Sequence, residues 1–492
     1  MSDKKRTIRL VVNNSAQQPP PVSGVYLVTD QGDNLVGRVR VALRGGVSVL
    51  QYRAKDKGRE ACREEGSELR QLCSSFGVAF IVNDDMQLAA DLDADGVHLG
   101  QDDDSVSAAR ELLGPGRIIG KSTHNLDEAL QAERDGADYI GFGAMYPTGS
   151  KNVTHIAGTV GLAAIRDRIK LPIVAIGGIT TSNACRVIDA GADAVAVISS
   201  VLSSPRPDIS AAELKLLFNR NRPFPRGSVL TVAGSDSGGG AGIQADIKTI
   251  TLLGSYAASV LTALTAQNTR GVSSVHGLPP SFVIEQLETV LADIPVDVIK
   301  TGMLHTPAII SALAENLTER AVMIPLVIDP VMVAKGGTTL MDRDGTFVFI
   351  EQLLPQAYLL TPNLPEAERL LGCQIRTVAD MEQAARQLCS MGAANVLIKG
   401  GHLAGQQSVD VLFDGSECQH FTAERIFTSN THGTGCTYAS AIAAYLAQGE
   451  PLRSAVEKAK EFITAAIRSA RPLGKGHSPV NHYQAALEKI KE

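Results

Sequence analysis

Amide and cationic side chains alternate at the end of a short apolar run in the N-terminal half. Gln51, Arg53 and Lys55 occupy every second position. Side chains two residues apart in an extended segment point to the same side, so these three groups are expected to face a common target. Asp84 ends another apolar run, and Asp103 lies shortly after a third. Carboxylates beside cations are typical of a site in which Mg2+ bridges protein and phosphate oxygens.

A second group of residues that could handle phosphate lies in the C-terminal half. Gly433, Thr434 and Gly435 precede an Ala-rich segment that is expected to be helical from Thr437 to Leu446. Unpaired amides at a helix N-terminus bind anions, so they could neutralise a phosphoryl group during transfer. Cys436 lies on the same turn, where the helix dipole is expected to lower the pKa of its thiol. A capped helix with a buried cysteine is the simpler alternative.

Three polar residues at the ends of other predicted strands could extend this second site. Lys399 is suited to nucleotide phosphates, while Asp329 and Glu366 are suited to Mg2+ or its water ligands. Each could instead cap a helix, and Glu366 could open one after Pro365. Their joint presence favours a nucleotide site.

A glycine run from Gly238 to Gly242 follows an apolar segment and precedes a predicted helix. Its spacing fits the fingerprint of dinucleotide-binding folds, but that fingerprint needs an acidic residue about 20 positions later. The segment from Ser259 to Arg270 contains none. We interpret the run as a turn near a small substrate, with Asp236 and Gln244 placed to form hydrogen bonds.

The elements that position the first site alternate between strands and helices. Such alternation predicts a parallel sheet, and eight strand–helix units closed on themselves make a (β/α)8 barrel. A doubly wound open sheet is the alternative. In a barrel the active site lies at the carboxyl ends of the strands, where the polar residues named above fall. The predicted strands are Val25–Asp30, Ser48–Arg53, Ala79–Asp84, Gly96–Gly100, Ile118–Thr123, Tyr139–Gly143, Pro172–Gly178 and Ala194–Ser200.

The second half has the same alternation, with a spacing that favours a three-layer α/β/α sheet over a second barrel. We expect a disordered tail over residues 1–21, the barrel over 22–203, a short Pro/Arg-rich linker over 204–227 with a helix from Ala211 to Asn219, and the layered domain over 228–492. The predicted strands of the second half are Val229–Ala233, Ser259–Ala266, Val298–Thr301, Leu326–Asp329, Tyr358–Thr361, Asn395–Lys399 and Asp410–Phe413.

Length and composition narrow the class of protein. The 492 residues are too many for one ordinary domain. A net charge of −6, an aromatic content of 4% and the absence of Trp argue against nucleic acid as a partner. No apolar run approaches the roughly 20 residues needed to cross a membrane. The seven Cys residues are scattered without metal-binding spacing, so we expect a reducing, cytoplasmic location.

The N-terminal half resembles the thiamine-phosphate synthases over about residues 22–203. Six motifs in the same order and spacing carry the resemblance. They are Gln51-x-Arg53-x-Lys55, Asn83-Asp84, the run from Ala94 to Asp103, Gly120-Lys121-Ser122-x-His124, Pro147-Thr148-x-Ser150-Lys151 and Ile176-Gly177-Gly178-Ile179.

This resemblance implies that the barrel joins a pyrimidinylmethyl diphosphate to a thiazole phosphate. It implies Mg2+ ligands at Asp84 and Asp103, and a diphosphate substrate held by Gln51, Arg53, Lys55, Asn83, Ser122 and Lys151. The thiazole phosphate would contact Thr148, Ser150, Gly178, Ile198 and Ser199. The family usually has Thr where this chain has Ser150. The thiazole tautomerases share the barrel, but the full diphosphate and metal set favours the synthases.

The C-terminal half resembles the hydroxymethylpyrimidine/phosphomethylpyrimidine kinases of the ribokinase-like superfamily over about residues 228–482. The carrying segments are Ala233 to Asp246, Ala266-Gln267-Asn268-Thr269, Lys300 to Leu304, Thr361 to Ala367 and Thr431 to Cys436.

The kinase resemblance implies that Gln267 reads the pyrimidine with help from Asp236 and Met303, and that Gly433, Thr434 and Gly435 form an anion hole. Cys436 occupies the position where sugar kinases of the superfamily carry an Asp base.

Together the two resemblances imply two phosphorylations by Mg-ATP followed by condensation with thiazole phosphate. One rival is a pyridoxal kinase fused to a tautomerase, and another is a metabolite-binding regulator without turnover. A homodimer is compatible with the sequence, which does not fix the oligomeric state.

Overall fold

The computed structural model describes residues 22–491 except 56, 149–155, 334–336 and 338–339. The predicted tail, residues 1–21, and the predicted site residues Ser150 and Lys151 lie outside the described residues. The chain divides into two compact units. The first comprises the described part of Met1–Gln31, Ser48–Gly178 and Ala190–Ala196, and the second comprises Gly32–Val47, Ile179–Asp189 and Val197–Glu492.

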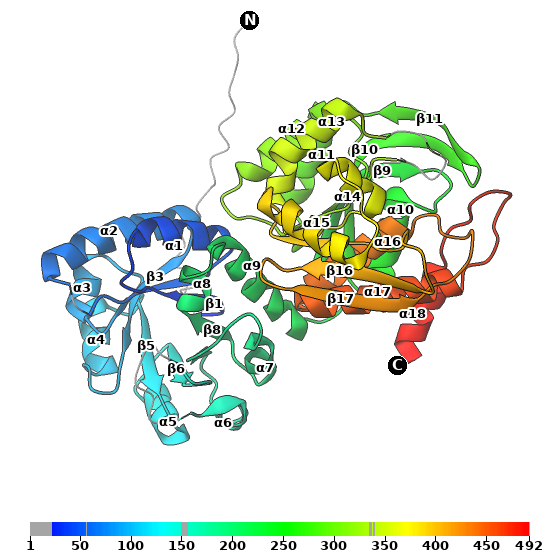
Figure 1. The fold of residues 1–492 in the computed structure, drawn as a ribbon. Helices are drawn as coiled ribbons and strands as arrows, with labels where there is room; N and C mark the ends of the chain where they lie inside the picture. Colours follow the sequence, from blue (N-terminus) through cyan, green and yellow to red (C-terminus); the bar gives the residue numbers. More distant parts are fainter. Residues whose placement is uncertain (1–21, 56, 149–155, 334–336, 338–339, 492) are drawn as a thin grey trace, which may run out of the picture. The chain divides into compact units, whose positions relative to one another are not determined.

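The first eight strands form a closed, all-parallel barrel in sequence order (Figure 1), which confirms the barrel prediction and excludes the open sheet. The strands are β1 (Gly24–Val28), β2 (Val49–Tyr52), β3 (Ala79–Asn83), β4 (Gly96–Leu99), β5 (Ile118–Thr123), β6 (Tyr139–Gly143), β7 (Ile173–Ile176) and β8 (Ala194–Val197). The intervening helices are α1 (Leu35–Arg44), α2 (Arg59–Phe76), α3 (Met86–Asp91), α4 (Val106–Leu113), α5 (Leu126–Arg134), α6 (Gly158–Arg166) and α7 (Ala184–Asp189).

The last predicted strand of the barrel is too long. The prediction ran from Ala194 to Ser200, but β8 ends at Val197, and α8 (Ser199–Leu202) begins two residues later. Ile198 between them has φ −125° and ψ −90°, outside the strand region. Ser199 therefore begins a helix instead of ending a strand.

The second unit is built on a nine-stranded sheet in the order β11-β10-β9-β12-β13-β14-β15-β16-β17. Its central six strands, from β10 to β15, are parallel, while β11, β16 and β17 pair antiparallel. The strands are β9 (Ser228–Asp236), β10 (Tyr256–Asn268), β11 (Gly271–Gly277), β12 (Val298–Thr301), β13 (Leu326–Ile328), β14 (Leu359–Leu360), β15 (Asn395–Ile398), β16 (Gln407–Phe413) and β17 (Cys418–Glu424).

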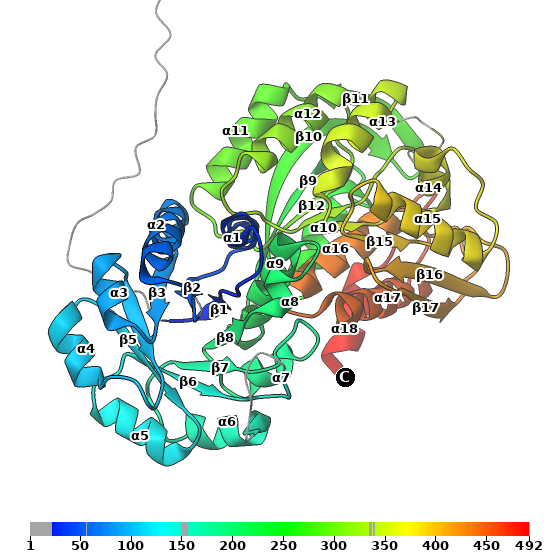
Figure 2. The ribbon, with the colours of Figure 1, turned by 60° about the vertical axis from the view of Figure 1, so that its left-hand side comes forward.

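Helices cover both faces of this sheet (Figure 2), as a three-layer fold requires. Alternation along β9 shows why, because Leu230 and Val232 join one core while Val229 joins the other. The first core packs α11 (Pro280–Leu291), α12 (Pro307–Thr318), α14 (Leu364–Leu371) and α15 (Val378–Ser390), next to the short α13 (Arg343–Val348). The second packs α9 (Pro207–Leu217), α10 (Gly242–Leu252), α16 (Thr434–Ala447), α17 (Leu452–Arg468) and α18 (His482–Lys491).

The predicted linker contributes to this second core. Its expected helix, Ala211 to Asn219, is observed as α9, and Ile209 and Leu216 of α9 pack in the core of the second unit. No helix among the described residues is both long and apolar enough to cross a membrane.

A fully buried ion pair ties the central strands of the second unit to its helices. Lys300 on β12 and Asp246 on α10 are both 0% exposed, and the Lys300 Nζ lies 2.9 Å from each carboxylate oxygen. Thr231 and Ser440 also donate to Asp246, at 2.6 and 2.7 Å. Burial alone would lower the pKa of Lys300, but the Asp246 carboxylate outweighs it and raises that pKa.

We expect Lys300→Met to destabilise the second unit by about 3–5 kcal/mol, because it leaves the Asp246 charge buried and uncompensated. Lys458→Met is the matched control, since Lys458 forms a part-exposed pair with Glu450 and should cost less than about 1 kcal/mol. Urea unfolding followed by circular dichroism measures both. Equal losses for the two variants would contradict a special role for the buried pair.

Candidate active sites

The described polar residues predicted for the first site lie at the carboxyl ends of the barrel strands. Gln51 lies near the end of β2, and Arg53 follows that strand directly. Asn83 ends β3, and Ser122 is near the end of β5. The strand register aligns these ends, because Asn83 pairs with His98 of β4. The barrel therefore brings to one rim the residues that the sequence predicted there.

Two carboxylates lie close together at this rim. Burial and, next, the nearby Asp103 carboxylate raise the pKa of Asp84 to about 6, against the opposing effect of Lys55. Asp84 has a left-handed backbone with φ 65°, which Asp tolerates better than most residues. The neighbouring Asp85 caps α3 by accepting from the Leu88 N–H at 2.7 Å. Asp85, and not Asp84, therefore caps this helix.

The loops after β6 and β7 meet at Gly178. Its φ is +64°, and a Cβ there would lie 2.5 Å from the carbonyl oxygen of Pro147. Only glycine fits both the conformation and the space. Thr148 follows Pro147 directly, so this approach brings the backbone next to a predicted phosphate-binding residue close to the glycine turn. Ile198 and Ser199 follow β8 at the start of α8.

The second unit contains a cavity of about 670 Å3 that collects the predicted residues of the C-terminal half. The predicted residues that line it are Asp236, Gln267, Met303, Asp329, Glu366, Lys399, Gly433, Thr434, Gly435 and Cys436. They come from strands β9 and β10, from helix α14, from helix α16 and the residue before it, and from the segments that follow β12, β13 and β15.

The N-terminus of α16 opens into this cavity. The helix begins at Thr434, three residues before the predicted start, so Gly435 and Cys436 belong to its first turn. Gly433 precedes the helix with φ 78°, and a Cβ at that position would overlap the carbonyl oxygen of Gly240. Glycine is therefore required where the two glycine-rich loops touch, and the amides of the first turn are left facing the cavity.

Charged groups converge beside the first turn of α16, where a Cβ on Gly435 would lie 3.3 Å from Asp329 Oδ2 and 3.6 Å from Lys399 Nζ. Lys399 Nζ lies 2.6 Å from Asp329 Oδ1. The Glu366 carboxylate accepts from the Asn363 N–H at 2.8 Å as part of a capping box that begins α14. Burial raises the pKa of Glu366 to about 7, Lys399 opposes this, and the Asp329 charge adds to it. Both the predicted capping role of Glu366 and its place beside Asp329 are thus observed.

The expectation that the Cys436 thiol has a lowered pKa is wrong. Burial raises its pKa to about 11, and although Lys300 opposes the rise, the carboxylates of Asp246 and Asp329 add to it. The residue borders the cavity and keeps some exposure, but its sulfur lies where charge is poorly solvated. Desolvation and two negative charges outweigh the helix dipole, even though Cys436 lies in the first turn of the helix.

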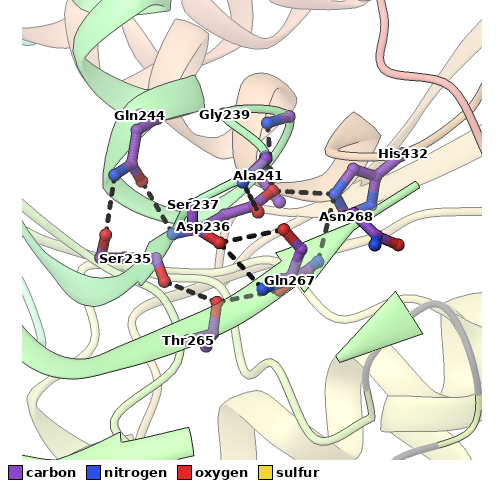
Figure 3. A network of polar contacts seen from close by, with 12 residues as sticks. Ser235, Asp236, Ser237, Gly239, Ala241, Gln244, Thr265, Gln267, Asn268 and His432 are labelled. Atoms are coloured by element: carbon purple, nitrogen blue, oxygen red, sulfur yellow. Dashed lines mark hydrogen bonds and ion pairs between the residues drawn. The ribbon is translucent and has the colours of Figure 1, made fainter. Parts of the chain in front are cut away.

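A hydrogen-bond network shapes the glycine loop beside the cavity (Figure 3). The Asp236 carboxylate accepts from the N–H groups of Gly238, Gly240 and Ala241 at 2.8, 3.0 and 2.8 Å. Burial would raise the pKa of Asp236, but the hydrogen bonds to its carboxylate lower it. The Asp236 side chain therefore fixes the loop, and its predicted help in reading the pyrimidine stays a prediction.

His432 is the member of this network that sequence reasoning missed. Its Nε2 lies 2.9 Å from Asp236 Oδ2 and 3.3 Å from Gln267 Nε2. Gln244, predicted only as a hydrogen-bonding group, bridges the Asp236 N–H and the Ser235 hydroxyl at 2.8 and 2.7 Å (Figure 3). The sequence signal that could have identified His432 was its position within the segment Thr431–Cys436, which carries the resemblance to the kinases.

Both halves of the chain match families of known activity. Residues 25–201 match thiamine monophosphate synthase, and residues 236–481 match phosphomethylpyrimidine kinase. The thiamine biosynthesis bifunctional protein ThiED of Geobacter sulfurreducens is 61% identical over 487 residues, which cover 99% of this chain and 99% of that protein. The chain belongs to the ThiED family. It is a bifunctional enzyme of thiamine biosynthesis that combines thiamine-phosphate synthase with hydroxymethylpyrimidine/phosphomethylpyrimidine kinase.

Relatives of the kinase half alone agree with this membership. The hydroxymethylpyrimidine/phosphomethylpyrimidine kinase of Haemophilus influenzae is 48% identical over 262 residues, which cover 52% of this chain and 96% of that protein. Among solved structures, an ADP complex of Bacillus subtilis pyridoxal kinase is similar with a TM-score of 0.50 and 41% identity, covering 53% of this chain and 99% of that one. The ThiED family has two enzymatic halves, so neither the tautomerase fusion nor the regulator without turnover describes this chain.

We expect alkylation of Cys436 by iodoacetamide to accelerate as the pH rises toward 11, because the reactive species is the thiolate and burial holds the pKa of this thiol near 11. The exposed Cys373 serves as the internal comparison and should react much faster at neutral pH. Peptide mass spectrometry after timed labelling measures both rates. A Cys436 rate that levels off near pH 7 would contradict a raised pKa.

Proposed function

We propose that the cavity of the second unit transfers the γ-phosphoryl group of ATP, first to hydroxymethylpyrimidine and then to its monophosphate. The convergence of the predicted residues on this one cavity carries the proposal. A relative of the kinase half has been solved with ADP, which supports ATP as the co-substrate.

Backbone amides would do most of the electrostatic work in the kinase reaction. The N–H groups of Gly435 and Cys436 at the start of α16 would bind the phosphoryl oxygens as charge shifts during transfer. Lys399 would hold nucleotide phosphates and is kept charged by Asp329. Positioning and electrostatics dominate phosphoryl transfer, so the enzyme needs no strong base.

Cys436 would act beside the substrate hydroxyl as a protonated thiol. A group whose pKa is about 11 is not ionised at neutral pH. It would therefore orient the hydroxyl by hydrogen bonding and keep its own proton, while the hydroxyl proton passes to an oxygen of the phosphoryl group as that group is transferred from ATP.

Mg2+ fits the carboxylates of both halves. Asp329 and Glu366 in the kinase cavity, and Asp84 with Asp103 at the barrel rim, are hard oxygen donors beside cationic side chains. Mg2+ usually takes one or two carboxylates and completes its shell with water and substrate phosphates. Among the described residues no three acidic, His or Cys side chains gather as a full protein-made metal site, and this pattern needs none. When bound, the metal would neutralise phosphate charge.

We propose that the barrel rim binds the pyrimidine diphosphate and lets diphosphate leave. Arg53, Lys55 and Ser122 would hold the negative charge that grows on the departing group, and Gln51 and Asn83 would hold the rest of the substrate. The thiazole nitrogen would then form the new bond to the pyrimidine methylene carbon. Thr148, Ser150, Gly178, Ile198 and Ser199 are assigned to the thiazole phosphate, and Lys151 to the diphosphate.

We also propose that the protein is located in the cytoplasm and that it forms a homodimer.

Pyridoxal is a second candidate substrate for the kinase cavity, because the similar ADP complex is that of a pyridoxal kinase. A kcat/KM for pyridoxal equal to that for hydroxymethylpyrimidine would favour it.

The two activities should separate by mutation. Cys436→Ala should reduce the kinase kcat by about 100-fold, because the substrate hydroxyl loses the group that orients it, and leave condensation of supplied pyrimidine diphosphate unchanged. Asp84→Asn should raise the Mg2+ concentration needed for condensation by about tenfold or more and leave the kinase unchanged. Each variant is thus the control of the other, measured by ADP release and by thiamine phosphate formation. Loss of both activities in either variant would contradict separate sites.

A further inference from the structure

A continuous chain of hydrogen bonds crosses the interior of the barrel. Gln51 Nε2 donates to Tyr26 OH at 3.2 Å, and the hydroxyls of Tyr26 and Tyr139 lie 2.7 Å apart. Tyr139 OH lies 2.9 Å from His98 Nδ1, and His98 Nε2 lies 2.9 Å from Ser122 Oγ. The chain joins two residues of the proposed diphosphate site, Gln51 and Ser122, through three groups that have no proposed contact with substrate.

The barrel makes room for this chain. A Cβ at Gly120 would overlap the ring of Tyr139, and one at Gly141 would lie 3.0 Å from His98 Cε1. Tyr26 and Tyr139 are 2% and 0% exposed, so the centre of the chain is closed to water. The ring centroids of His98 and Tyr139 are 5.4 Å apart with planes 28° from parallel, which fixes the imidazole against the phenol.

When His98 is neutral, proton counting leaves the chain two arrangements. Burial raises the pKa of both Tyr26 and Tyr139, so each phenol keeps its one proton and donates once. A neutral His98 has one donor nitrogen and one acceptor nitrogen. All bonds must therefore point in the same direction, either from Gln51 toward Ser122 or from Ser122 toward Gln51.

We propose that Tyr26, Tyr139 and His98 are positioning residues that couple the hydrogen-bonding state of Gln51 to that of Ser122. The inference rests on the proposed substrate roles of Gln51 and Ser122. When the chain runs from Gln51, its amide nitrogen donates inward and its oxygen is presented to the site as an acceptor. His98 then donates to Ser122, and the Ser122 hydroxyl proton is presented to the site as a donor.

This arrangement matches a substrate with an amino group at one end and an anion at the other. The amino group needs the Gln51 oxygen, and the diphosphate needs the Ser122 proton, so both ends favour the same direction. A ligand with an oxo group at the amino position would need Gln51 to donate into the site. That would reverse the direction of the hydrogen bonds and turn the Ser122 proton toward His98, away from the diphosphate. A ligand with an oxo group would therefore lose a hydrogen bond at its diphosphate as well as at its pyrimidine.

Tyr139→Phe interrupts the chain at its centre and tests this coupling. We expect the KM for the pyrimidine diphosphate to rise about tenfold to a hundredfold, the loss of one hydrogen bond to a charged group, while the KM for thiazole phosphate stays unchanged. The preference for the amino diphosphate over its oxo analogue should fall by about tenfold. Tyr139→Phe should also add little to Ser122→Ala, because the chain acts through Ser122.

Tyr52→Phe is the matched control. Tyr52 lies next to Gln51, is 1% exposed, and donates its hydroxyl to Glu65 at 2.8 Å, outside the chain. Its loss should leave both KM values and the amino preference unchanged. Tyr26→Phe cuts the same chain at another bond and replaces Tyr139→Phe if that variant fails to fold. The kinase activity of the same polypeptide reports whether the rest of the protein is intact.

The possible results distinguish failure of the proposed coupling from failure of the proposed substrate roles of Gln51 and Ser122. Ser122→Ala and Gln51→Ala with unchanged KM would overturn the proposed roles of these residues. A raised KM for Ser122→Ala, with an unchanged amino preference in both Tyr139→Phe and Tyr26→Phe, would overturn the coupling alone. Additive effects of Tyr139→Phe and Ser122→Ala would also overturn it.

Discussion

Parallel strands that share a sheet end at the same edge, and both halves of this chain depend on that constraint. In the barrel it places the ends of β2, β3 and β5 on one rim. In the layered sheet it brings the ends of β9, β13 and β15 to one cavity. Side chains from distant parts of the sequence thereby meet where apolar strands give way to polar loops. Both folds therefore place charged and polar side chains around an expected phosphate site, at the edge of the apolar core.

The halves differ in which groups are proposed to meet that charge. The kinase half would rely on backbone amides at the start of α16, and much of the surrounding structure supports that helix. Gly433 must be glycine to pass Gly240, and the buried pair of Lys300 and Asp246 anchors the helix through Ser440. The barrel would rely on two cationic side chains, Arg53 and Lys55, at the rim.

Sequence patterns predicted the strands that are buried on both faces, because continuous runs of Val, Ile and Leu mark them. The antiparallel strands β11 and β17 were missed. Their sequences, Gly271–Gly277 and Cys418–Glu424, are largely polar and lie at the two edges of the sheet. Only pairing with a neighbour makes them strands.

The candidate sites show the same limit. Motifs predicted which residues gather in the kinase cavity, because residue types and the ends of the apolar strands can be recognised in the sequence. They did not predict the raised pKa of Cys436, which comes from burial and from Asp246 and Asp329, residues 190 and 107 positions away in the numbering. The role of His432 was missed for the same reason, because its partners Asp236 and Gln267 are close only after folding.

The central claim is that one polypeptide makes a pyrimidine diphosphate and then consumes it. The most direct test supplies the purified protein with hydroxymethylpyrimidine, thiazole phosphate, Mg2+ and ATP, and measures the products together. We predict two molecules of ADP and one of inorganic diphosphate for each thiamine phosphate formed. ADP release without thiamine phosphate, or thiamine phosphate formed with a single ADP, would contradict the account.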